Sequence, residues 1–399
     1  MDQVPPLRLT LAEISGALGD LATLGPLLVA LVTLNRLNPT GVFLVVGLAY
    51  ILNGLYYRLP VPVQPLKAVS VTAIALGLAP GVISAAGWLM GLVLLILAAT
   101  RLIEPLSRFF TRPVVRGIQL GLGLLLVRSA WQLIAGPALF SEAVGWSPAA
   151  GQWPIRLFLV LGAALLLLAG LLRRRLPTAL LILGFGLAVS LALGVSPAAD
   201  HLRWGLRPPT WYFPTLSDLT TAAWLLVIPQ LPLTIGNATI ATADAARRYF
   251  GPQAVRVRPR ALLITMGLSN LLAGVVGGMP ICHGSGGLTA HVRLGARTGA
   301  APLLIGGLCL GTALLLDGGL LPLLVLFPLP VLGVLLFYVG VQHGLLVADL
   351  RRPEEWTVAG VVALIALLRN NLALGFLAGI VLDWSLSRLS RPARAGKGR

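Results

Sequence analysis

Apolar runs of similar length alternate with short charged or Pro-rich breaks along the whole chain. A helix needs roughly 20 apolar residues to cross the hydrocarbon core of a bilayer, and most of these runs are close to that length. The runs cover residues 11–34, 40–57, 62–79, 81–100, 114–135, 155–172, 177–195, 222–246, 260–277, 285–298, 300–317, 323–349, 356–369 and 371–387. The pattern predicts an all-α polytopic membrane protein with about 14 transmembrane segments, seven in each half of the chain.

A polar stretch separates the two sets of seven runs. We therefore expect a first repeat over residues 1–195 (spans 1–7), a connecting segment over 196–221, a second repeat over 222–388 (spans 8–14) and a basic cytoplasmic tail over 389–399. The chain is 57% hydrophobic and 11% charged, with a mean hydropathy of +0.90. This balance excludes an ordinary soluble enzyme, and we expect no enzymatic activity.

The net charge of +17 would suggest a nucleic-acid partner if the protein were soluble. Most of the 30 lysines and arginines, however, fall in loops that lie on the inner side when the N-terminus is cytoplasmic and the number of spans is even. By the positive-inside rule, this distribution of positive charge indicates the membrane topology. We therefore expect no nucleic-acid partner. We expect an integral protein of a bacterial inner membrane with both termini cytoplasmic, because the sequence shows no organellar targeting segment.

Two of the predicted spans begin with a stretch that cannot form a regular helix. Residues 60–67 alternate proline with other residues, and residues 277–287 are rich in glycine. Each stretch should lead into a short half-helix, in the third span of each half. An odd number of spans per half makes the halves an inverted repeat, and broken helices at matching positions of such repeats indicate a midplane substrate site. The alternative is that Pro and Gly only kink two ordinary helices.

The two breaks supply donors for an anion and contain no carboxylate. Each half-helix N-terminus presents free N–H groups and about half a positive charge, and Lys67 would add a full charge, which together match a dianion. The side-chain donors, and the glycines that let backbone amides approach oxygen atoms, are Gln64, His283, Ser285, Gly284, Gly286 and Gly287. Lys67 could instead snorkel or pair with Asp20. Cys282 adjoins His283, but no second His/Cys pair stands at ligand spacing, so we expect no metal site and no cofactor.

Three acidic residues fall within or at the end of predicted spans: Glu13, Asp20 and Asp244. Ionisable groups at membrane depth are functional candidates because burying them is costly, so one of the three could carry a proton or organise a sodium site. The alternative is that they form internal salt bridges with Lys67 or with arginines. Asn237, in the eighth span, could donate to a substrate oxygen or belong to an ordinary helix contact.

Four stretches resemble the signatures of one family: GALGDLATLGP at 16–26, PVPVQPLK at 60–67, GNATIATAD at 236–244 and MPICHGSGGL at 279–288. They are similar to the molybdate transporter family related to the sulfate permeases. We expect the chain to function without the cytoplasmic regulatory domain that many sulfate permeases carry, which is typical of the molybdate branch.

The resemblance implies a seven-plus-seven inverted-repeat fold with a core of spans 1–4 and 8–11 and a gate of spans 5–7 and 12–14. It also implies an elevator motion of the core against the gate. The implied anion site lies between the half-helices and is formed by Gln64, Lys67 and the amides from Ala68 onward, with residues 283–287 opposite and with Asp20 and Asn237 alongside.

The leading hypothesis is a secondary active transporter that imports a tetrahedral oxyanion, molybdate first, coupled to H+ or Na+. Sulfate is the close alternative, since both anions are dianions that differ chiefly in size. A nucleobase or carboxylate carrier of the same fold and an anion channel are further alternatives, although a nucleobase carrier would be expected to show carboxylates in the breaks. The expected partners are the oxyanion, the coupling ion and the lipid bilayer, and the sequence leaves open whether the protein forms a homodimer.

Overall fold

The computed structural model describes residues 5–100, 102, 110–140, 153–172, 178–195, 208–315 and 326–389, without the side chains of residues 18–23, 179, 180 and 389. The first half of the chain forms α1 (Leu11–Thr33), α2 (Pro39–Tyr57), the short strand β1 (Gln64–Pro65), α3 (Lys67–Leu76), α4 (Pro80–Ala99), α6 (Arg112–Ala135), α7 (Trp153–Leu172) and α8 (Thr178–Ala192). Residues 196–207 of the predicted connecting segment and residues 390–399 of the predicted basic tail lie outside the described residues.

The second half begins at α9 (Leu216–Ala222), six residues ahead of the predicted boundary. It continues through η3 (Ala223–Val227), α10 (Ile228–Leu233), η4 (Thr234–Ala241), α11 (Thr242–Phe250), η5 (Gly251–Arg256), α12 (Pro259–Val275), β2 (Ile281–Cys282), α13 (Ser285–Arg293), α14 (Ala300–Leu315), α16 (Leu329–Gly344), η6 (Leu345–Asp349), α17 (Pro353–Arg369) and α18 (Leu372–Leu389). Each apolar run of the sequence contains at least one of these helices, so the all-α class is confirmed.

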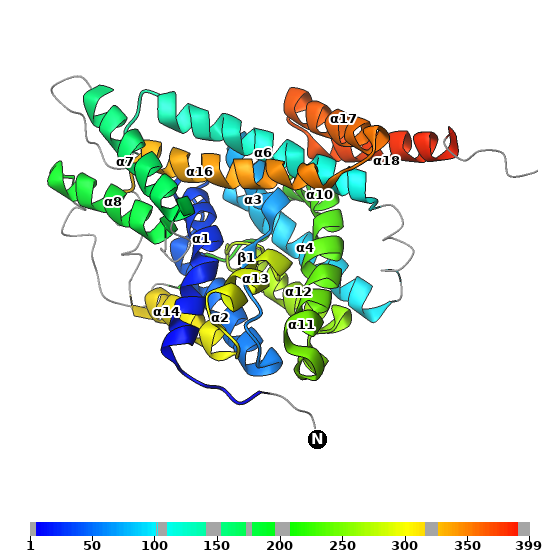
Figure 1. Ribbon diagram of the computed structural model, residues 1–399, viewed down its shortest axis with the longest axis horizontal. Coiled ribbons are helices and arrows are strands. Elements are labelled where there is room, and N and C mark those ends of the chain that lie inside the picture. The colour runs from blue at the N-terminus through cyan, green and yellow to red at the C-terminus, as the bar shows by residue number, and fades with distance from the viewer. Residues whose placement is uncertain are drawn as a thin grey trace, which may run out of the picture.

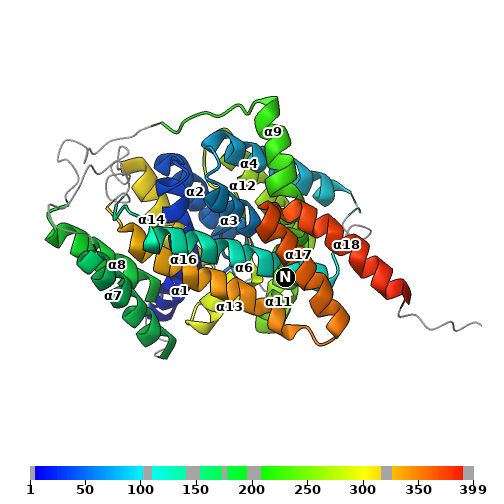
Figure 2. The same cartoon turned by 90° about the horizontal axis from the view of Figure 1, so that it is seen from above.

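The helices form two groups (Figures 1 and 2). An upper layer holds α6, α7, α8, α16, α17 and α18, in which α6 packs along α16 and α17. A lower group holds α1 to α4 and α10 to α14, and α9 packs against α4 of this group. The upper layer meets the lower group where α6 contacts α3 and where α16 contacts α1. The two half-helices α3 and α13 therefore belong to one group, with the other group beside them.

In the lower group, helices of the two halves of the chain pack against each other in a reciprocal pattern. The second helix of the first half, α2, packs on α14, and α4 packs on α12. Glycines allow both close crossings, because a Cβ added at Gly47 would lie 2.8 Å from the Leu310 nitrogen and one added at Gly87 would lie 2.8 Å from the Gly274 nitrogen. Small residues at matching crossings therefore allow the two halves to pack closely.

The outer surface of the molecule suits a lipid environment. Six described helices are long and apolar enough to cross a bilayer, and α3, α12 and α14 are shorter apolar helices. Many leucines are exposed, and Trp131 and Trp153 are 68% and 72% exposed, in the manner of aromatic side chains at a membrane interface. The chain is an integral membrane protein with a helical fold.

The eighth predicted span departs from a regular helix. Residues 216–250 form one long helical run, which the π-helical turns η3 and η4 interrupt. Pro229 and Pro232 lie in α10 between these turns, where each removes a backbone donor and its ring clashes with the preceding turn. The wider π turns absorb that disturbance and frequently occur at functional sites. The second turn, η4, carries Gly236 and Asn237.

Candidate functional site: two half-helices that meet at a strand pair

The two broken segments of the sequence meet in space as an antiparallel strand pair. Gln64 pairs with Cys282 and Pro65 with Ile281, and the Leu66 amide donates to the Pro280 carbonyl over 2.9 Å. This pairing satisfies backbone groups that lie away from water and from any helix, as membrane depth requires. Each strand leads directly into a half-helix, so the N-termini of α3 and α13 lie on either side of the crossing (Figure 1).

Buried polar side chains hold the crossing in place. Asn270 of α12 binds both backbone groups of Ile281, at 2.8 Å and 2.9 Å. The His283 ring bonds the Pro62 carbonyl through Nδ1 at 2.9 Å and the Thr265 hydroxyl through Nε2 at 2.9 Å. The imidazole that the sequence suggested as a substrate donor is therefore engaged on both nitrogens by structural partners, and His283 is fully buried.

The N-terminus of α3 is capped from within the protein. The side-chain oxygen of Gln230, in α10, accepts from the amides of Ala68 at 2.7 Å and Val69 at 3.4 Å. The Gln230 amide nitrogen donates to the Thr234 hydroxyl over 2.9 Å, and the side chain is 2% exposed. The Ala68 amide, expected from the sequence to bind substrate, is thus occupied. Gln230 was not among the expected site residues. Its position as a polar residue between two prolines in an apolar run could have indicated a functional or structural role.

The N-terminus of α13 is open by comparison. Among the described residues, the amides of Ser285 and Gly286 have no hydrogen-bond acceptor, whereas the Gly287 amide bonds the Gly284 carbonyl at 3.1 Å. Gly286 is exposed, and a Cβ added there would meet no atom within 4 Å. This first turn consequently leaves donors and space for a ligand, which helix N-termini offer readily to anions.

Residues from two other segments converge on this open turn. The Ser285 hydroxyl donates to the Asn237 side-chain oxygen over 2.6 Å, and the Asn237 side-chain nitrogen has no hydrogen-bond acceptor among the described residues. A Cβ added at Gly284 would lie 2.8 Å from the Gln64 side-chain oxygen and 3.5 Å from the Asn237 side-chain nitrogen. The structure therefore brings Gln64, Asn237 and Ser285 together around Gly284.

Lys67 begins α3 and is partly exposed. Within the described residues its ammonium forms neither a hydrogen bond nor an ion pair. Lys67 thus adds a full positive charge at the strand crossing. The α3 amides that follow it are hydrogen-bonded to the Gln230 side chain.

The acidic residues lie elsewhere. Glu13 is 3% exposed and its carboxylate accepts from the amides of Arg297, Thr298 and Ala301, where it caps the start of α14. Asp244 is exposed and forms an ion pair with Arg248 at 2.9 Å. Asp20 lies in α1, and its side chain is outside the described part of the structure. In the described residues, no cluster of three His, Cys, Asp or Glu side chains could hold a metal ion.

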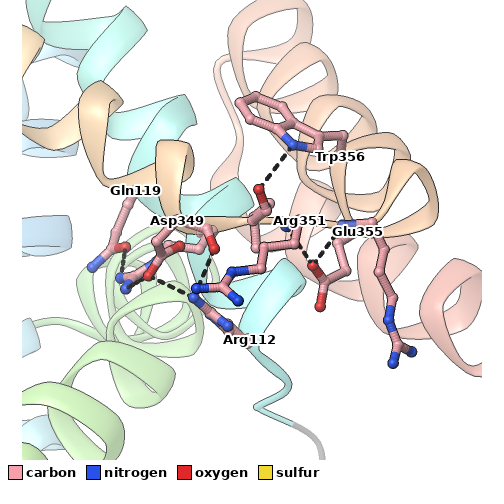
Figure 3. A network of polar contacts seen from close by, with 9 residues as sticks. Arg112, Gln119, Asp349, Arg351, Glu355 and Trp356 are labelled. Atoms are coloured by element: carbon pink, nitrogen blue, oxygen red, sulfur yellow. Dashed lines mark hydrogen bonds and ion pairs between the residues drawn. The ribbon is translucent and has the colours of Figure 1, made fainter.

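A second polar network lies at the end of α16, in the upper layer (Figure 3). Arg116 of α6 binds the Asp349 carboxylate through two nitrogens, and Arg112 bonds the Asp349 carbonyl at 2.7 Å. At the start of α17 the amides of Arg351 and Arg352 bind Glu355 and hold the pKa of that carboxyl below its usual range. These contacts join α6, η6 and the start of α17 into one unit.

Comparison with known families gives a consistent match. The family described as "Molybdate transporter of MFS superfamily" matches residues 12–126 and 222–342, which include both strands and both half-helices. Molybdate transporter 1 of Chlamydomonas reinhardtii is 30% identical, over 94% of this chain and 91% of the relative. Molybdate transporter 2 of Arabidopsis thaliana is 29% identical, over 93% of this chain and 86% of the relative. A probable sulfate transporter of Mycobacterium tuberculosis is 26% identical, over 76% of this chain and 54% of the relative.

Solved structures share the fold at low sequence identity. The murine Solute Carrier 26 family member A9 anion transporter in the inward-facing state aligns with a TM-score of 0.69 and 17% identity, over 97% of this chain and 70% of that chain. The transmembrane domain of the cyanobacterial bicarbonate transporter BicA aligns with a TM-score of 0.63 and 16% identity, over 94% of this chain and 98% of that chain. The relatives matched along most of the sequence are transporters, and the family match covers more than half of the chain, so this protein belongs to the molybdate transporter family.

Proposed function

We propose that this protein is a secondary active transporter that imports a tetrahedral oxyanion, with molybdate as the preferred substrate. The observation that carries the proposal is the open first turn of α13, where the Ser285 and Gly286 amides have no acceptor among the described residues and a Cβ at Gly286 would meet open space. Lys67 begins the other half-helix at the same strand crossing and has no ion pair among the described residues. A dianion there would gain charge-assisted hydrogen bonds from the amides and the full charge of Lys67.

The proposed ligands of the anion are the amides of Ser285 and Gly286, the side-chain nitrogen of Asn237 and the ammonium of Lys67. Gln64 lies alongside them, near Gly284. His283 and Glu13 are assigned to holding the fold, because their polar atoms are engaged by the Pro62 carbonyl and the start of α14. This set contains donors only, which suits a fully ionised oxyanion and does not suit a cation.

The proposed transport cycle is an elevator motion of the lower group against the upper layer, driven by a coupled H+ or Na+. It is supported by the placement of both half-helices in one group and by the compact α6–α16 contact in the other. We further propose 14 spans arranged as a seven-plus-seven inverted repeat, in keeping with the reciprocal α2–α14 and α4–α12 contacts. The proposed location is a bacterial inner membrane with both termini cytoplasmic, which the positive-inside distribution supports.

Sulfate is the second candidate substrate, favoured by the likeness to the probable sulfate transporter of Mycobacterium tuberculosis. Uptake of radiolabelled molybdate into proteoliposomes that contain the purified full chain tests the proposal. We expect saturable uptake that accumulates molybdate above its external concentration when a proton or sodium gradient is applied, with tungstate competing better than sulfate. Preferred competition by sulfate would assign the protein to sulfate transport. Flux that neither saturates nor responds to an ion gradient would identify a channel, and absence of any oxyanion flux would reject the proposal.

A further inference from the structure

The eighth span is hydrogen-bonded to both half-helices. At one end, the Gln230 side chain caps the first turn of α3 and bonds the Thr234 hydroxyl. At the other end, the Ser285 hydroxyl of α13 bonds the Asn237 side chain, and Thr242 bonds the residue that precedes the N-cap of α13. The π turn η4 lies between these two ends. One segment of the chain therefore contacts both sides of the candidate anion site.

Thr242 joins this segment to α13. Its hydroxyl lies 2.6 Å from the His283 carbonyl oxygen and 3.0 Å from the Asn237 carbonyl oxygen, and the residue is fully buried. The first carbonyl directly follows strand β2, which leads into α13. The second belongs to the residue whose side-chain nitrogen is a proposed ligand of the anion. A hydroxyl has one proton to donate, so the two carbonyls share it and are held close together.

A second threonine of the same turn shows what the Thr242 contact adds. The Thr239 hydroxyl bonds the Thr234 carbonyl over 2.9 Å, and Thr239 is as deeply buried as Thr242. Both threonines therefore bond the carbonyl five residues earlier, which fits the wider spacing of a π turn. The Thr242 hydroxyl also bonds a residue 41 positions further along the chain. Thr239 stabilises the turn, whereas Thr242 also attaches the turn to the half-helix.

We propose that Thr242 is a positioning residue that sets the spacing between the Asn237 side-chain nitrogen and the open amides of Ser285 and Gly286, and thereby the size of the oxyanion that binds best. The proposal rests on the proposed function, because it takes these three donors as ligands of the anion. Thr242 acts through the two carbonyls that its hydroxyl bonds, and it does not contact the anion.

The spacing of donors can separate anions that charge cannot. Molybdate and sulfate carry the same charge and differ chiefly in size, so attraction to Lys67 contributes little to the difference between their affinities. Hydrogen bonds form only over a narrow range of distances, so donors on two fixed segments favour one anion radius. The gap between the segments is tightly packed, because a Cβ added at Gly284 would lie 2.8 Å from the Gln64 side-chain oxygen and 3.5 Å from the Asn237 side-chain nitrogen.

Titrations of the purified full chain with molybdate and with sulfate give the ratio of the two affinities. T242V keeps the shape of the side chain and removes the hydroxyl. We expect the preference for the favoured anion to fall by about fivefold or more, since one charge-assisted hydrogen bond to that anion is misplaced. T242S restores the hydroxyl and should restore the preference. T239V is the matched control: it removes a buried hydroxyl with the same kind of bond from the same turn, so it should lower the thermal stability similarly and leave the preference unchanged.

The outcomes separate this inference from the proposed function. An unchanged affinity ratio in T242V, or an equal change of the ratio in T239V, overturns the inference and leaves the oxyanion site intact. No binding of molybdate, tungstate or sulfate by the wild-type protein overturns the proposed function and the inference together. If T242V does not fold, a structure of the tungstate-bound wild-type protein decides. The Asn237 nitrogen within hydrogen-bond range of the anion, with the Thr242 hydroxyl still on the His283 carbonyl, supports the inference, and loss of either contact overturns it.

Discussion

The two half-helices begin at the same strand crossing, yet they present different chemistry to it. At α3 the Gln230 side chain caps the first amides, and the Lys67 side chain carries the positive charge. At α13 there is no charged side chain in the first turn, and the positive end of the helix is left open at Ser285 and Gly286. One half of the protein therefore contributes a charge, and the other contributes directional donors.

This difference shows how two equivalent segments can divide the binding of one anion. Amides at fixed positions recognise the geometry of oxygen atoms, whereas a lysine is a flexible point charge that attracts any anion. We attribute shape recognition to α13 and most of the charge recognition to Lys67. The variants described next separate the two contributions.

The largest effect is expected from G286V. Its side chain would fill the space in front of the open amides, where a Cβ meets no protein atom, so the backbone should fold while the anion is excluded. Loss of two charge-assisted hydrogen bonds corresponds to more than about a hundredfold weaker binding. Titration of the purified variant with molybdate measures this. G307V is the matched control, since Gly307 is an exposed helical glycine in α14 that also faces open space. Equal affinity of G286V and G307V would remove α13 from the site.

The second effect is expected from K67A. Removing one of the positive charges should weaken molybdate binding by about tenfold or more, which corresponds to about 1.4 kcal/mol. K67R keeps the charge and should retain most of the affinity. Because the attraction is partly screened by salt, the difference between wild type and K67A should shrink as ionic strength rises. An unchanged dissociation constant in K67A at low salt would make Lys67 structural.

A smaller effect on binding is expected from Q230A. This change exposes the Ala68 and Val69 amides and removes a cap, which should lower stability by about 1 kcal/mol. Affinity should change by less than in K67A, because the α3 amides are not among the proposed ligands. Thermal unfolding and molybdate titration of the same sample measure both quantities. A loss of affinity as large as that of G286V, at unchanged stability, would show that Gln230 itself contacts the anion.

The smallest effect is expected from D244N. Asp244 is exposed and its ion pair with Arg248 is a surface contact within one helix, which contributes at most about 1 kcal/mol. Coupled uptake by D244N in proteoliposomes should match that of wild type. If D244N transports molybdate but no longer concentrates it, Asp244 has a coupling role that its exposure in this structure does not reveal.

The sequence predicted the positions of the secondary-structure elements better than the directions in which individual side chains point. Apolar length and Pro- or Gly-rich breaks located the helices and the two non-helical segments 60–67 and 277–287, because these features depend on backbone chemistry alone. The sequence did not predict that the two segments pair as antiparallel strands. Composition identified donors around Gly284 but could not tell which way each points. His283 turns into the α2–α12 contact, and Glu13 turns to the start of α14.

The eighth span shows a second reason why the sequence did not predict some of the contacts around the site. Gln230 reaches the α3 amides only because Pro229 and Pro232 displace α10 between two π turns, and its partner lies 162 positions away in the sequence. Such a contact is set by tertiary packing, which local pattern does not encode.

The most direct test of the divided site is to locate a heavy anion in a structure of the tungstate-bound protein. Tungsten scatters strongly, so its position relative to the two half-helices can be read without ambiguity. We predict a peak in front of the first turn of α13, with oxygens in hydrogen-bond range of the Ser285 and Gly286 amides and the Lys67 ammonium alongside, while Gln230 still caps α3. A peak on the Ala68 and Val69 amides with Gln230 displaced, or no peak between the half-helices, would contradict the account.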